Sequence, residues 1–412
     1  DDFIELYQEQ YQIIKRQRKI ASQETLPSIE KFKLQPNDMQ TRFILNLRKI
    51  LNTGEERALL ISATGTGKTY ASAFAMRELG FKRVLFLVHR GQLARQTKRS
   101  YERIFGNDVS MGLVGAGHQE DDKDYVFATV QTLTREVHLA NYKQDAFDCI
   151  ILDEAHHSSA DSYQKIMRYF RPRLWLGMTA TPDKRDDYAA ERNIYEIFHY
   201  QIAYEIRLQQ AMEENMLCPF HYFGISDLSV IEDKTLKARK LSAADFQQLV
   251  CDERVKHIIE QAEYYGYSGE RVKGLIFCSR IEESKELSNK FNKLGYRTIA
   301  LNGDASEEER IEAFERLAME ESDVTEKREP LDYIFSVEIL NEGVDIVEVN
   351  QVIMLRPTES PIVFIQQLGR GLRKAEGKEY VVILDFIGNY MNNFMIPVAL
   401  SGDRTYNADT IR

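Results

Sequence analysis

The chain has 412 residues, of which 43% are hydrophobic and 29% are charged. A chain of this length exceeds what one hydrophobic core usually supports, so we expect two domains. No apolar run approaches the roughly 20 residues needed to cross a bilayer, which excludes a membrane span. The cysteines lie far apart without a metal-ligand spacing, a usage typical of buried thiols in a reducing cytoplasm.

The formal net charge is −10, so only a local basic region could bind a polyanion such as nucleic acid. Residues 82–103 form such a region and could serve as a phosphate track, with a solvated helix face as the alternative. Its cations are Lys82, Arg83, Arg90, Arg95, Lys98, Arg99 and Arg103. Residues 307–329 are strongly acidic and are expected to face away from any phosphate backbone.

Short apolar runs alternate with amphipathic stretches, a pattern that predicts parallel strands joined by helices. In the first half, the predicted strands are Leu59–Ser62, Val84–Val88, Tyr125–Thr129, Cys149–Leu152 and Leu174–Met178. In the second half, they are Gly274–Cys278, Arg297–Leu301, Tyr333–Ser336, Gln351–Leu355 and Tyr380–Leu384. Because such strands are buried on both faces, the predicted fold class is α/β with two successive parallel sheets, each flanked by helices.

The domain boundaries follow from changes in composition along the chain. Residues 201–265 are polar and helix-favouring, which predicts a connector with a helical insertion. The domains on either side are residues 34–200 and 266–390. Residues 1–33 are predicted to form a helical extension, and residues 391–412 to begin a further segment of a longer protein.

A glycine-rich loop follows the first predicted strand and precedes the helical stretch Tyr70–Leu79. Its residues are Ala63, Thr64, Gly65, Thr66, Gly67, Lys68 and Thr69. The glycines let backbone N–H groups point at phosphate oxygens, while Lys68 reaches the β- and γ-phosphates and Thr69 ligates Mg²⁺. Ser62 stands where the strict pattern has glycine, and a chance glycine-rich turn is the alternative interpretation.

Two carboxylates, Asp153 and Glu154, follow the predicted strand Cys149–Leu152. We expect this strand to lie parallel to and next to the strand before the glycine-rich loop, which would put Asp153 where Mg²⁺ is held. Glu154 is then placed to orient and polarise an attacking water. An acidic turn at the surface could have the same sequence, which is the alternative interpretation.

Two arginines, Arg370 and Arg373, lie three residues apart in the segment Gln366–Arg373. On a helix, this spacing puts them on one face, from which they could stabilise the charge that develops in phosphoryl transfer. Gln366 belongs to the same candidate catalytic set. Surface salt bridging is the alternative for the arginines.

Together, these blocks resemble a superfamily 2 helicase of the DEAH type over residues 34–390. The resemblance implies two tandem RecA-like domains that bind ATP and Mg²⁺ at their interface and act on nucleic acid. In this comparison, residues 63–69 resemble motif I, residues 153–156 resemble motif II and residues 366–373 resemble motif VI.

The resemblance also implies further roles. The residues that would couple the nucleotide state to lobe closure are His156, Thr179 and Thr181. The residues that would bind nucleotide are Gln40, which reads adenine, and Gly343 and Asp345 of motif V. The residues that would contact the nucleic-acid backbone are Arg90, Thr129 and Gln131. His157 is interpreted as a polar neighbour of motif II, with a second catalytic group as the alternative.

Shorter stretches of the sequence resemble proteins that act on DNA. Residues 340–345 and 355–373 resemble motor subunits of type I and type III restriction enzymes and excision-repair helicases, which act on duplex DNA. The tail resembles bacterial helicases with a phospholipase-D-like nuclease domain, which implies a bacterial cytoplasmic protein, with a nuclease domain or subunit in the full-length protein. We therefore expect an ATP-dependent translocase or helicase that prefers DNA over RNA and acts in restriction, defence or repair. An RNA helicase and an ATP-gated clamp or sensor that does not move are the alternatives.

Overall fold

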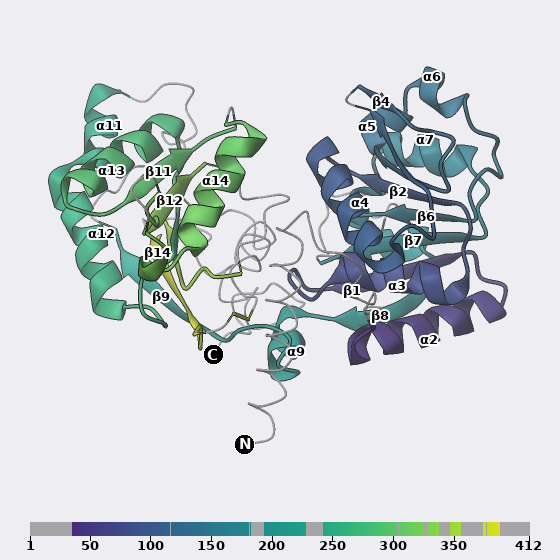
Figure 1. Ribbon diagram of the computed structural model, residues 1–412, viewed down its shortest axis with the longest axis horizontal. Helices are drawn as coiled ribbons and strands as arrows, with labels where there is room; N and C mark the ends of the chain where they lie inside the picture. Colours follow the sequence, from purple (N-terminus) through teal and green to yellow (C-terminus); the bar gives the residue numbers. More distant parts are fainter. Residues whose placement is uncertain are drawn as a thin grey trace.

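The computed structural model describes residues 35–115, 117–180, 182, 193–227, 242–303, 305–324, 328–337, 347–355, 374–375 and 377–387. The described chain forms two α/β lobes that lie side by side (Figure 1). None of its helices is both long enough and apolar enough to span a bilayer. The four cysteines are free thiols, and Cys149, Cys218 and Cys278 are buried.

The first lobe contains an eight-stranded sheet in its described residues. Its strands lie in the order β4 (His118–Gln119), β3 (Met111–Gly115), β5 (Tyr125–Thr129), β2 (Val84–Val88), β6 (Cys149–Leu152), β7 (Leu174–Thr179), β1 (Arg57–Ser62) and β8 (Ile202–Ile206). Neighbouring strands are parallel except for β3 and β4, which are antiparallel. The central strands are buried on both faces, as their continuous apolar sequences predict.

Helices cover both faces of this sheet. They are α2 (Asp38–Asn52), α3 (Lys68–Leu79), α4 (Gly91–Phe105), α5 (Val130–Leu133), α6 (Glu136–Leu139), η1 (Ala155–His157), α7 (Asp161–Tyr169) and α8 (Ile194–Ile197). On one face, Phe43 of α2 and Tyr101 of α4 pack in one apolar cluster with Leu60 of β1. On the other face, Ile166 of α7 belongs to a second cluster with Leu59 of β1. The alternation of β1 side chains therefore divides the core into two layers.

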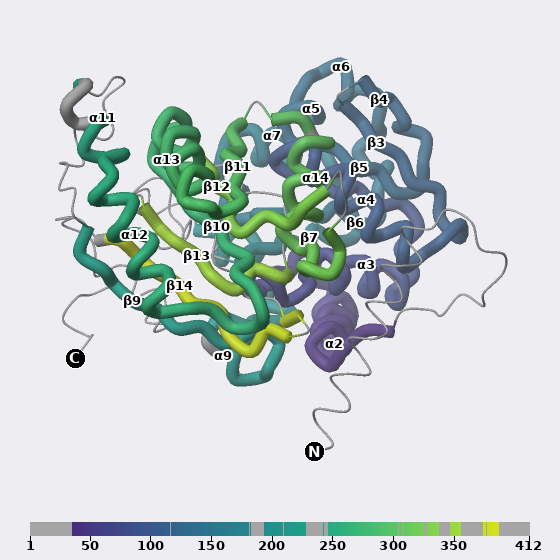
Figure 2. The backbone as a smooth tube through the Cα atoms, turned by 60° about the vertical axis from the view of Figure 1, so that its left-hand side comes forward, coloured from purple at the N-terminus to yellow at the C-terminus, as the bar shows by residue number. Residues whose placement is uncertain are grey.

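The second lobe contains a six-stranded sheet, again counted over the described ranges. Its strands, all parallel, lie in the order β11 (Thr298–Leu301), β12 (Tyr333–Ser336), β10 (Gly274–Phe277), β13 (Gln351–Met354), β14 (Val381–Ile387) and β9 (Phe220–Ser226). Its helices are α9 (Leu208–Glu213), α11 (Ala243–Val250), α12 (Asp252–Tyr265), α13 (Ile281–Lys293), α14 (Glu307–Ala318) and η2 (Glu321–Asp323). Helices α11, α12 and α13 lie on the side away from the first lobe, whereas α14 lies on the side toward it (Figures 1 and 2).

Every apolar run predicted to be a strand is a strand, with ends that differ by a few residues. The structure differs from the predicted connector over residues 201–265. Strand β8 pairs with β1 of the first sheet, and β9 pairs with β14 of the second. Each is an edge strand that is only partly buried and includes polar residues, unlike the continuously apolar inner strands. The chain therefore crosses between lobes near α9.

The connection at α9 is packed. One apolar cluster extends from Met39 and Ala63 of the first lobe, through Leu208 and Leu217 beside α9, to Ile383 of β14. A second contact between the lobes joins the Arg310 guanidinium of α14 to the Gln92 side chain of α4, at 3.4 Å. Helix α14, within the acidic stretch, thus approaches the first lobe, and part of its charge is paired within the second lobe, since Arg328 lies 2.7 Å from Glu312.

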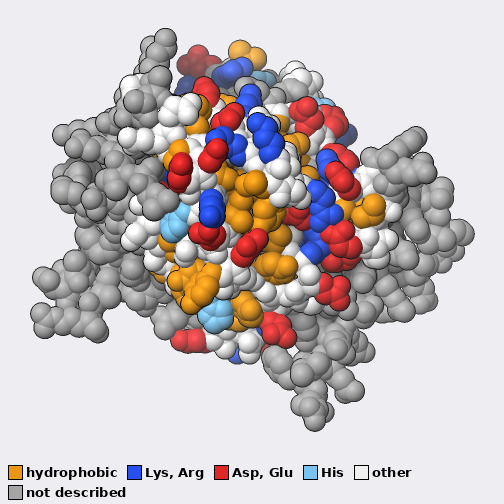
Figure 3. All heavy atoms as spheres, turned by 90° about the vertical axis from the view of Figure 1, so that its left-hand side faces the viewer, with side chains coloured by type: hydrophobic (Ala, Val, Ile, Leu, Met, Phe, Trp, Pro, Cys, Tyr) orange, Lys and Arg blue, Asp and Glu red, His pale blue; other side chains and the backbone are white. Residues whose placement is uncertain are grey.

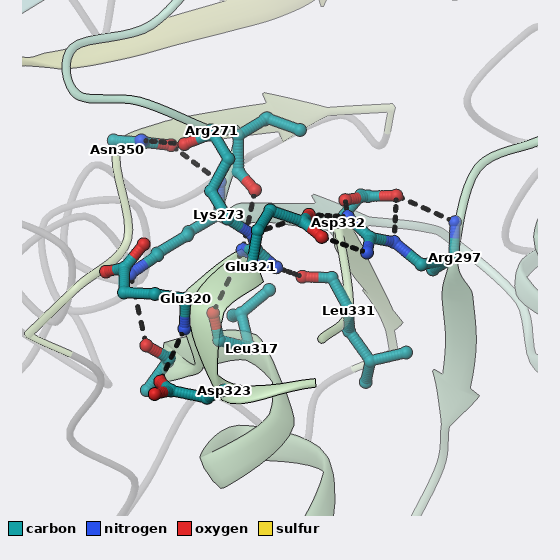
Figure 4. A network of polar contacts seen from close by, with 12 residues as sticks. Arg271, Lys273, Arg297, Leu317, Glu320, Glu321, Asp323, Leu331, Asp332 and Asn350 are labelled. Atoms are coloured by element: carbon teal, nitrogen blue, oxygen red, sulfur yellow. Dashed lines mark hydrogen bonds and ion pairs between the residues drawn. The ribbon is translucent and has the colours of Figure 1, made fainter. Parts of the chain in front are cut away.

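A polar network closes the amino-terminal edge of the second sheet (Figure 4). Asn350, before β13, accepts a hydrogen bond from the Lys273 N–H at 2.8 Å and donates to the carbonyl oxygens of Ser268 and Arg271. Asp332, before β12, pairs with Arg297 at 2.7 Å, before β11. These side chains replace water for polar groups that the sheet edge would otherwise leave buried without partners.

Arg254 of α12 is the centre of a buried ion cluster. Its guanidinium donates to both carboxylate oxygens of Asp227, at 2.9 and 2.7 Å, and to Glu283 at 3.1 Å. All three side chains are at most 5% exposed. Glu283 in turn accepts from the backbone N–H of Ser279 at 2.9 Å. The cluster therefore joins the end of β9 to α12 and α13.

We predict that Arg254→Met destabilises the protein by about 3–5 kcal/mol, because it leaves two buried carboxylates without their counter-charge. Urea unfolding followed by circular dichroism measures this change. Lys256→Met on the same helix is the control, since Lys256 pairs with Glu260 on the exposed surface and should contribute less than about 0.5 kcal/mol. Equal shifts for the two variants would contradict a structural role for the cluster.

Candidate functional site

The predicted site residues of the first lobe gather at one edge of its sheet. Strands β5, β2, β6, β7 and β1 are consecutive neighbours and parallel, so their carboxyl ends meet at the same edge (Figure 1). The residues placed there are Thr129 at the end of β5, Arg90 two residues after β2, Asp153 after β6, Thr179 at the end of β7, and the glycine-rich loop after β1. The site is therefore assembled by strand order.

The glycine-rich loop has the curled backbone that its sequence predicts. Gly65 and Gly67 have φ angles of +91° and +89°, a left-handed conformation that glycine adopts without steric cost. Gly67 is the N-cap residue of α3, so the positive end of this helix faces the loop. The Lys68 ammonium donates to the Ser62 carbonyl oxygen at 2.9 Å, across the mouth of the loop. The loop thus has the form of an anion cradle.

Ser62, which replaces the glycine of the strict pattern, has a role in this loop. Its hydroxyl lies 2.5 Å from the Thr66 hydroxyl, which also donates to the Ala63 carbonyl oxygen at 2.7 Å. Ser62 and Thr66 are both buried. These hydrogen bonds tie the start of the loop to its middle residue, Thr66, so the serine is accommodated in the turn.

Gln40 lies beside the glycine-rich loop, although it is distant in sequence. A Cβ atom at Gly67 would come within 3.4 Å of the Gln40 side-chain nitrogen. Gln40 is 5% exposed, and its side-chain oxygen accepts from the Asn37 backbone N–H at 3.0 Å in a reciprocal capping box at the start of α2. The cap therefore fixes the amide next to the phosphate loop.

The predicted position of Asp153 is wrong by one strand, because β7 lies between β6 and β1. Asp153 nevertheless shares an edge with the loop, and Lys68 acts on its charge. Burial raises the pKa of Asp153 most and the neighbouring Glu154 carboxylate raises it further, while Lys68 lowers it, with a result of about 7. Since a cation would favour the ionised form, this carboxyl group suits a divalent metal such as Mg²⁺.

Glu154 has a φ angle of +49°, a left-handed conformation that is unusual for a residue with a side chain. Its Oε2 atom is buried and lies 3.3 Å from His156 Nδ1, but makes no hydrogen bond among the described residues. A buried carboxylate oxygen in this condition could accept a hydrogen bond from a water molecule.

His156 contacts Thr179, another residue to which the resemblance assigns coupling. Its Nδ1 atom lies 3.0 Å from the Thr179 hydroxyl, and both residues are buried. This hydrogen bond joins the turn after β6 to the end of β7. The structure therefore brings together two of the residues that the resemblance assigns to coupling, while that role stays a prediction.

The predicted nucleic-acid residues lie on the same edge, at the end away from β1. Arg90 is exposed and is the N-cap residue of α4. Thr129 caps α5 by accepting from the Thr132 backbone N–H at 3.1 Å, and Gln131 is exposed on α5. The structure therefore places Arg90 and Gln131 at the surface, whereas the Thr129 hydroxyl has a capping role.

Several predicted site residues lie outside the described residues. They are Thr181, Gly343, Asp345, Gln366, Arg370 and Arg373. Their roles stay predictions.

One feature of the site was not predicted from sequence. The rings of His89 and His157 stack with centroids 5.7 Å apart, and the rings of His156 and His157 are 4.2 Å apart. His157 therefore makes ring contacts with two other histidines, in addition to being the polar neighbour that its sequence position suggested. A histidine after each of two strands was the available signal, but only the strand order makes β2 and β6 neighbours.

Two domain families match the sequence. The res subunit of type III restriction enzymes matches residues 33–184, and the helicase conserved C-terminal domain matches residues 253–375. IRC3 of Saccharomyces cerevisiae, named as a candidate ATP-dependent helicase, is 26% identical over 82% of this chain and 49% of that protein. The endonuclease subunit of the type I restriction enzyme EcoAI of Escherichia coli is 26% identical over 85% of this chain and 46% of the subunit. This chain thus spans about half of each relative.

Solved structures share the fold. A fragment described as a candidate HsdR subunit of a type I restriction enzyme from Vibrio vulnificus has a TM-score of 0.65 at 22% identity, over 88% of this chain and 66% of the fragment. The type ISP restriction-modification enzyme LlaBIII bound to DNA has a TM-score of 0.63 at 21% identity, over 87% of this chain and 28% of that enzyme. The order of the two matched domains, their two RecA-like parallel sheets and the phosphate loop show that the chain belongs to the superfamily 2 helicases, a family of ATP-dependent enzymes.

Proposed function

We propose that this chain is a DNA-stimulated ATPase that moves along DNA, with ATP bound between its two lobes. The observation that carries the proposal is the assembly, at one sheet edge, of the phosphate loop, the Asp153–Glu154 turn and the His156–Thr179 contact. The exposed Arg90 lies farther along the same edge. Nucleotide chemistry and nucleic-acid contact then share one row of adjacent strands.

In this proposal, the backbone N–H groups of Thr64–Thr69 and the Lys68 ammonium bind the triphosphate. Lys68 exchanges its bond to the Ser62 carbonyl for one to phosphate. Thr69 and Asp153 would hold Mg²⁺, which when bound neutralises charge on the β- and γ-phosphates.

Glu154 is the residue we assign to the attacking water. Its buried Oε2 atom can accept a hydrogen bond from water and orient it toward the γ-phosphate, which is mainly a positioning task in phosphoryl transfer. From the second lobe, Arg370 and Arg373, with Gln366, would stabilise the charge that moves to the leaving oxygen, and Gly343 and Asp345 would contact the nucleotide. Thr181 would act with Thr179 in coupling.

Movement would follow from opening and closing of the interface between the lobes. The Arg310–Gln92 contact and the packed α9 segment are the described points at which the lobes meet. Closure around ATP and release after hydrolysis would shift the grip of one lobe on the nucleic acid relative to the other.

DNA is the proposed substrate, because relatives include restriction-enzyme subunits and a fold neighbour was solved bound to DNA. The track would begin at Arg90 and continue with Thr129 and Gln131. By contrast, the described part of the outer face of the second lobe mixes cations, acids and apolar side chains (Figure 3). Such a mixed surface is less suited to a phosphate backbone than a run of cations.

Lys68→Ala and Glu154→Gln are each predicted to lower the kcat of ATP hydrolysis by about 100-fold or more, since each removes a group that acts on the transferred phosphate or its attacking water. Phosphate release measures this rate, and circular dichroism checks the fold. Lys143→Ala, at an exposed lysine of the same lobe outside residues 82–103, is the control. Normal turnover by both site variants would end the proposed function.

Gln40→Glu is predicted to raise the KM for ATP by about five- to tenfold while leaving that for GTP nearly unchanged, because it removes one amide donor to adenine. The variant keeps the acceptor for Asn37 and the charge suits a helix start, so α2 should stay folded. Asn37→Ala is the converse control. It loses the capping side chain, which should lower the free energy of unfolding by about 1 kcal/mol, but it should keep the preference for ATP over GTP. If the two variants changed that preference equally, Gln40 would be a cap residue alone.

Duplex DNA is predicted to stimulate ATP hydrolysis more than single-stranded DNA or RNA, at one fixed salt concentration. Arg90→Ala should weaken stimulation by all three nucleic acids. It should also reduce the steepness of the plot of the logarithm of the DNA-binding constant against the logarithm of salt concentration by about 1, as expected for one lost phosphate contact. Arg171→Ala, at the opposite edge of the sheet, is the control. Stronger stimulation by RNA would favour an RNA helicase, and binding with only a single round of hydrolysis would favour a clamp or sensor.

A further inference from the structure

Three histidine rings form a continuous stack at the carboxyl edge of the first sheet. His89 and His157 are near parallel, with an interplanar angle of 23° and centroids 5.7 Å apart. His157 then meets His156 at 4.2 Å and 46°. His156 is buried, whereas His89 and His157 are partly exposed. Rings at these separations touch, so a shift of one displaces the next.

The stack crosses between two adjacent strands. His89 follows β2 and His157 belongs to η1, after β6, and these strands pair in parallel with Leu87 opposite Leu152. The backbone is also joined there, since the Asp153 N–H donates to the Leu87 carbonyl oxygen at 2.9 Å. The stack therefore bridges two elements that are otherwise fixed by the sheet, at the point where both leave it.

The two ends of the stack reach different parts of the proposed machinery. At one end, His156 contacts Thr179 at 3.0 Å and lies 3.3 Å from Glu154 Oε2. At the other end, His89 precedes Arg90, the exposed N-cap residue of α4. The first turn of α4 also carries Gln92, which lies 3.4 Å from Arg310 of the second lobe.

The turn that carries His156 and His157 is suited to respond to such a shift. It begins at Glu154, whose φ of +49° is held by surrounding contacts and not by its own preference. The η1 helix that follows has only three residues. A short turn of this kind has few internal hydrogen bonds, so its ring contacts can transmit a shift of His89 to Glu154.

We propose that His89 and His157 are positioning residues, which act through His156 to orient Glu154 when the start of α4 engages nucleic acid. This inference rests on the proposed function, in which Glu154 acts on water and Arg90 contacts phosphate. Stimulation by DNA is then transmitted through the ring stack, from the end of β2 to the end of β6. The stack supplements the contact between His156 and Thr179, which carries the nucleotide side of the coupling.

The test measures ATP turnover by the intact chain with and without a duplex DNA of fixed length. His89→Ala and His157→Ala should each lower the DNA-stimulated kcat by about fivefold or more, the usual lower range of allosteric coupling. Basal turnover, the KM for ATP and the Kd for DNA should stay within about twofold. Replacement of both histidines should cost no more than either alone, because the stack fails as a unit.

Two further variants separate positioning from simple packing. His89→Phe and His157→Phe keep a flat ring and should recover most of the stimulation. His118→Ala is the matched control in the same lobe, because His118 is exposed in β4. Circular dichroism and thermal melting show whether each variant is folded, and an unfolded alanine variant is replaced in the comparison by His→Gln.

The outcomes distinguish this inference from the proposed function. If DNA stimulates turnover, Lys68→Ala abolishes it and the histidine variants keep full stimulation, the inference alone is wrong. The inference would also be overturned if the double variant lost DNA-stimulated kcat by the product of the two single losses, or if basal turnover fell in parallel with stimulated turnover. If DNA does not stimulate the unaltered chain, or Lys68→Ala retains turnover, the proposed function fails and the inference fails with it.

Discussion

Two adjacent carboxyl groups, those of Asp153 and Glu154, share one half-buried turn beside the Lys68 ammonium, and the rest of the site follows from this crowding of charge. Burial and mutual repulsion raise the pKa of Asp153 to about 7, against the effect of Lys68. Such a turn is more stable when further positive charge arrives. A divalent cation and the arginines of a second lobe are the kinds of groups that meet this need in phosphoryl transfer. The electrostatics of the first lobe alone therefore favour a site completed by a nucleotide–metal complex.

The order of strands in the first sheet also orders the tasks that we assign. The phosphate loop follows β1, Thr179 ends β7, the carboxylate turn follows β6, and the basic start of α4 follows β2. Each step from nucleotide to nucleic acid is thus one strand wide, about 4.8 Å in a sheet. Contacts between neighbouring side chains, such as His156 with Thr179 and His157 with His89, are sufficient to span it. No longer chain of contacts is needed to connect the proposed nucleotide site with the proposed nucleic-acid contact.

The sequence best predicted those features that depend on residues close together in the chain. Continuous apolar runs revealed the inner strands, and the glycine-rich loop carried its own conformational requirements at Gly65 and Gly67. Strand order was not local, so β7 was not expected between β6 and β1, and the edge strands β8 and β9 were taken for connector. The cap made by Gln40 and the stack of His89 on His157 also depend on neighbours brought together by the fold. The roles of Arg370 and Arg373 stay sequence predictions.

Two places in the described structure treat a buried polar group in opposite ways. At the amino edge of the second sheet, Asn350 makes three hydrogen bonds through its side chain. At the carboxyl edge of the first sheet, Glu154 has a left-handed backbone and a buried oxygen without a hydrogen bond among the described residues. An unsatisfied buried acceptor costs about 1–3 kcal/mol, so a fold keeps one at a loss of stability unless another molecule supplies the missing donor. Water held for attack on a phosphate is such a donor, and it connects the strained turn to the proposed chemistry.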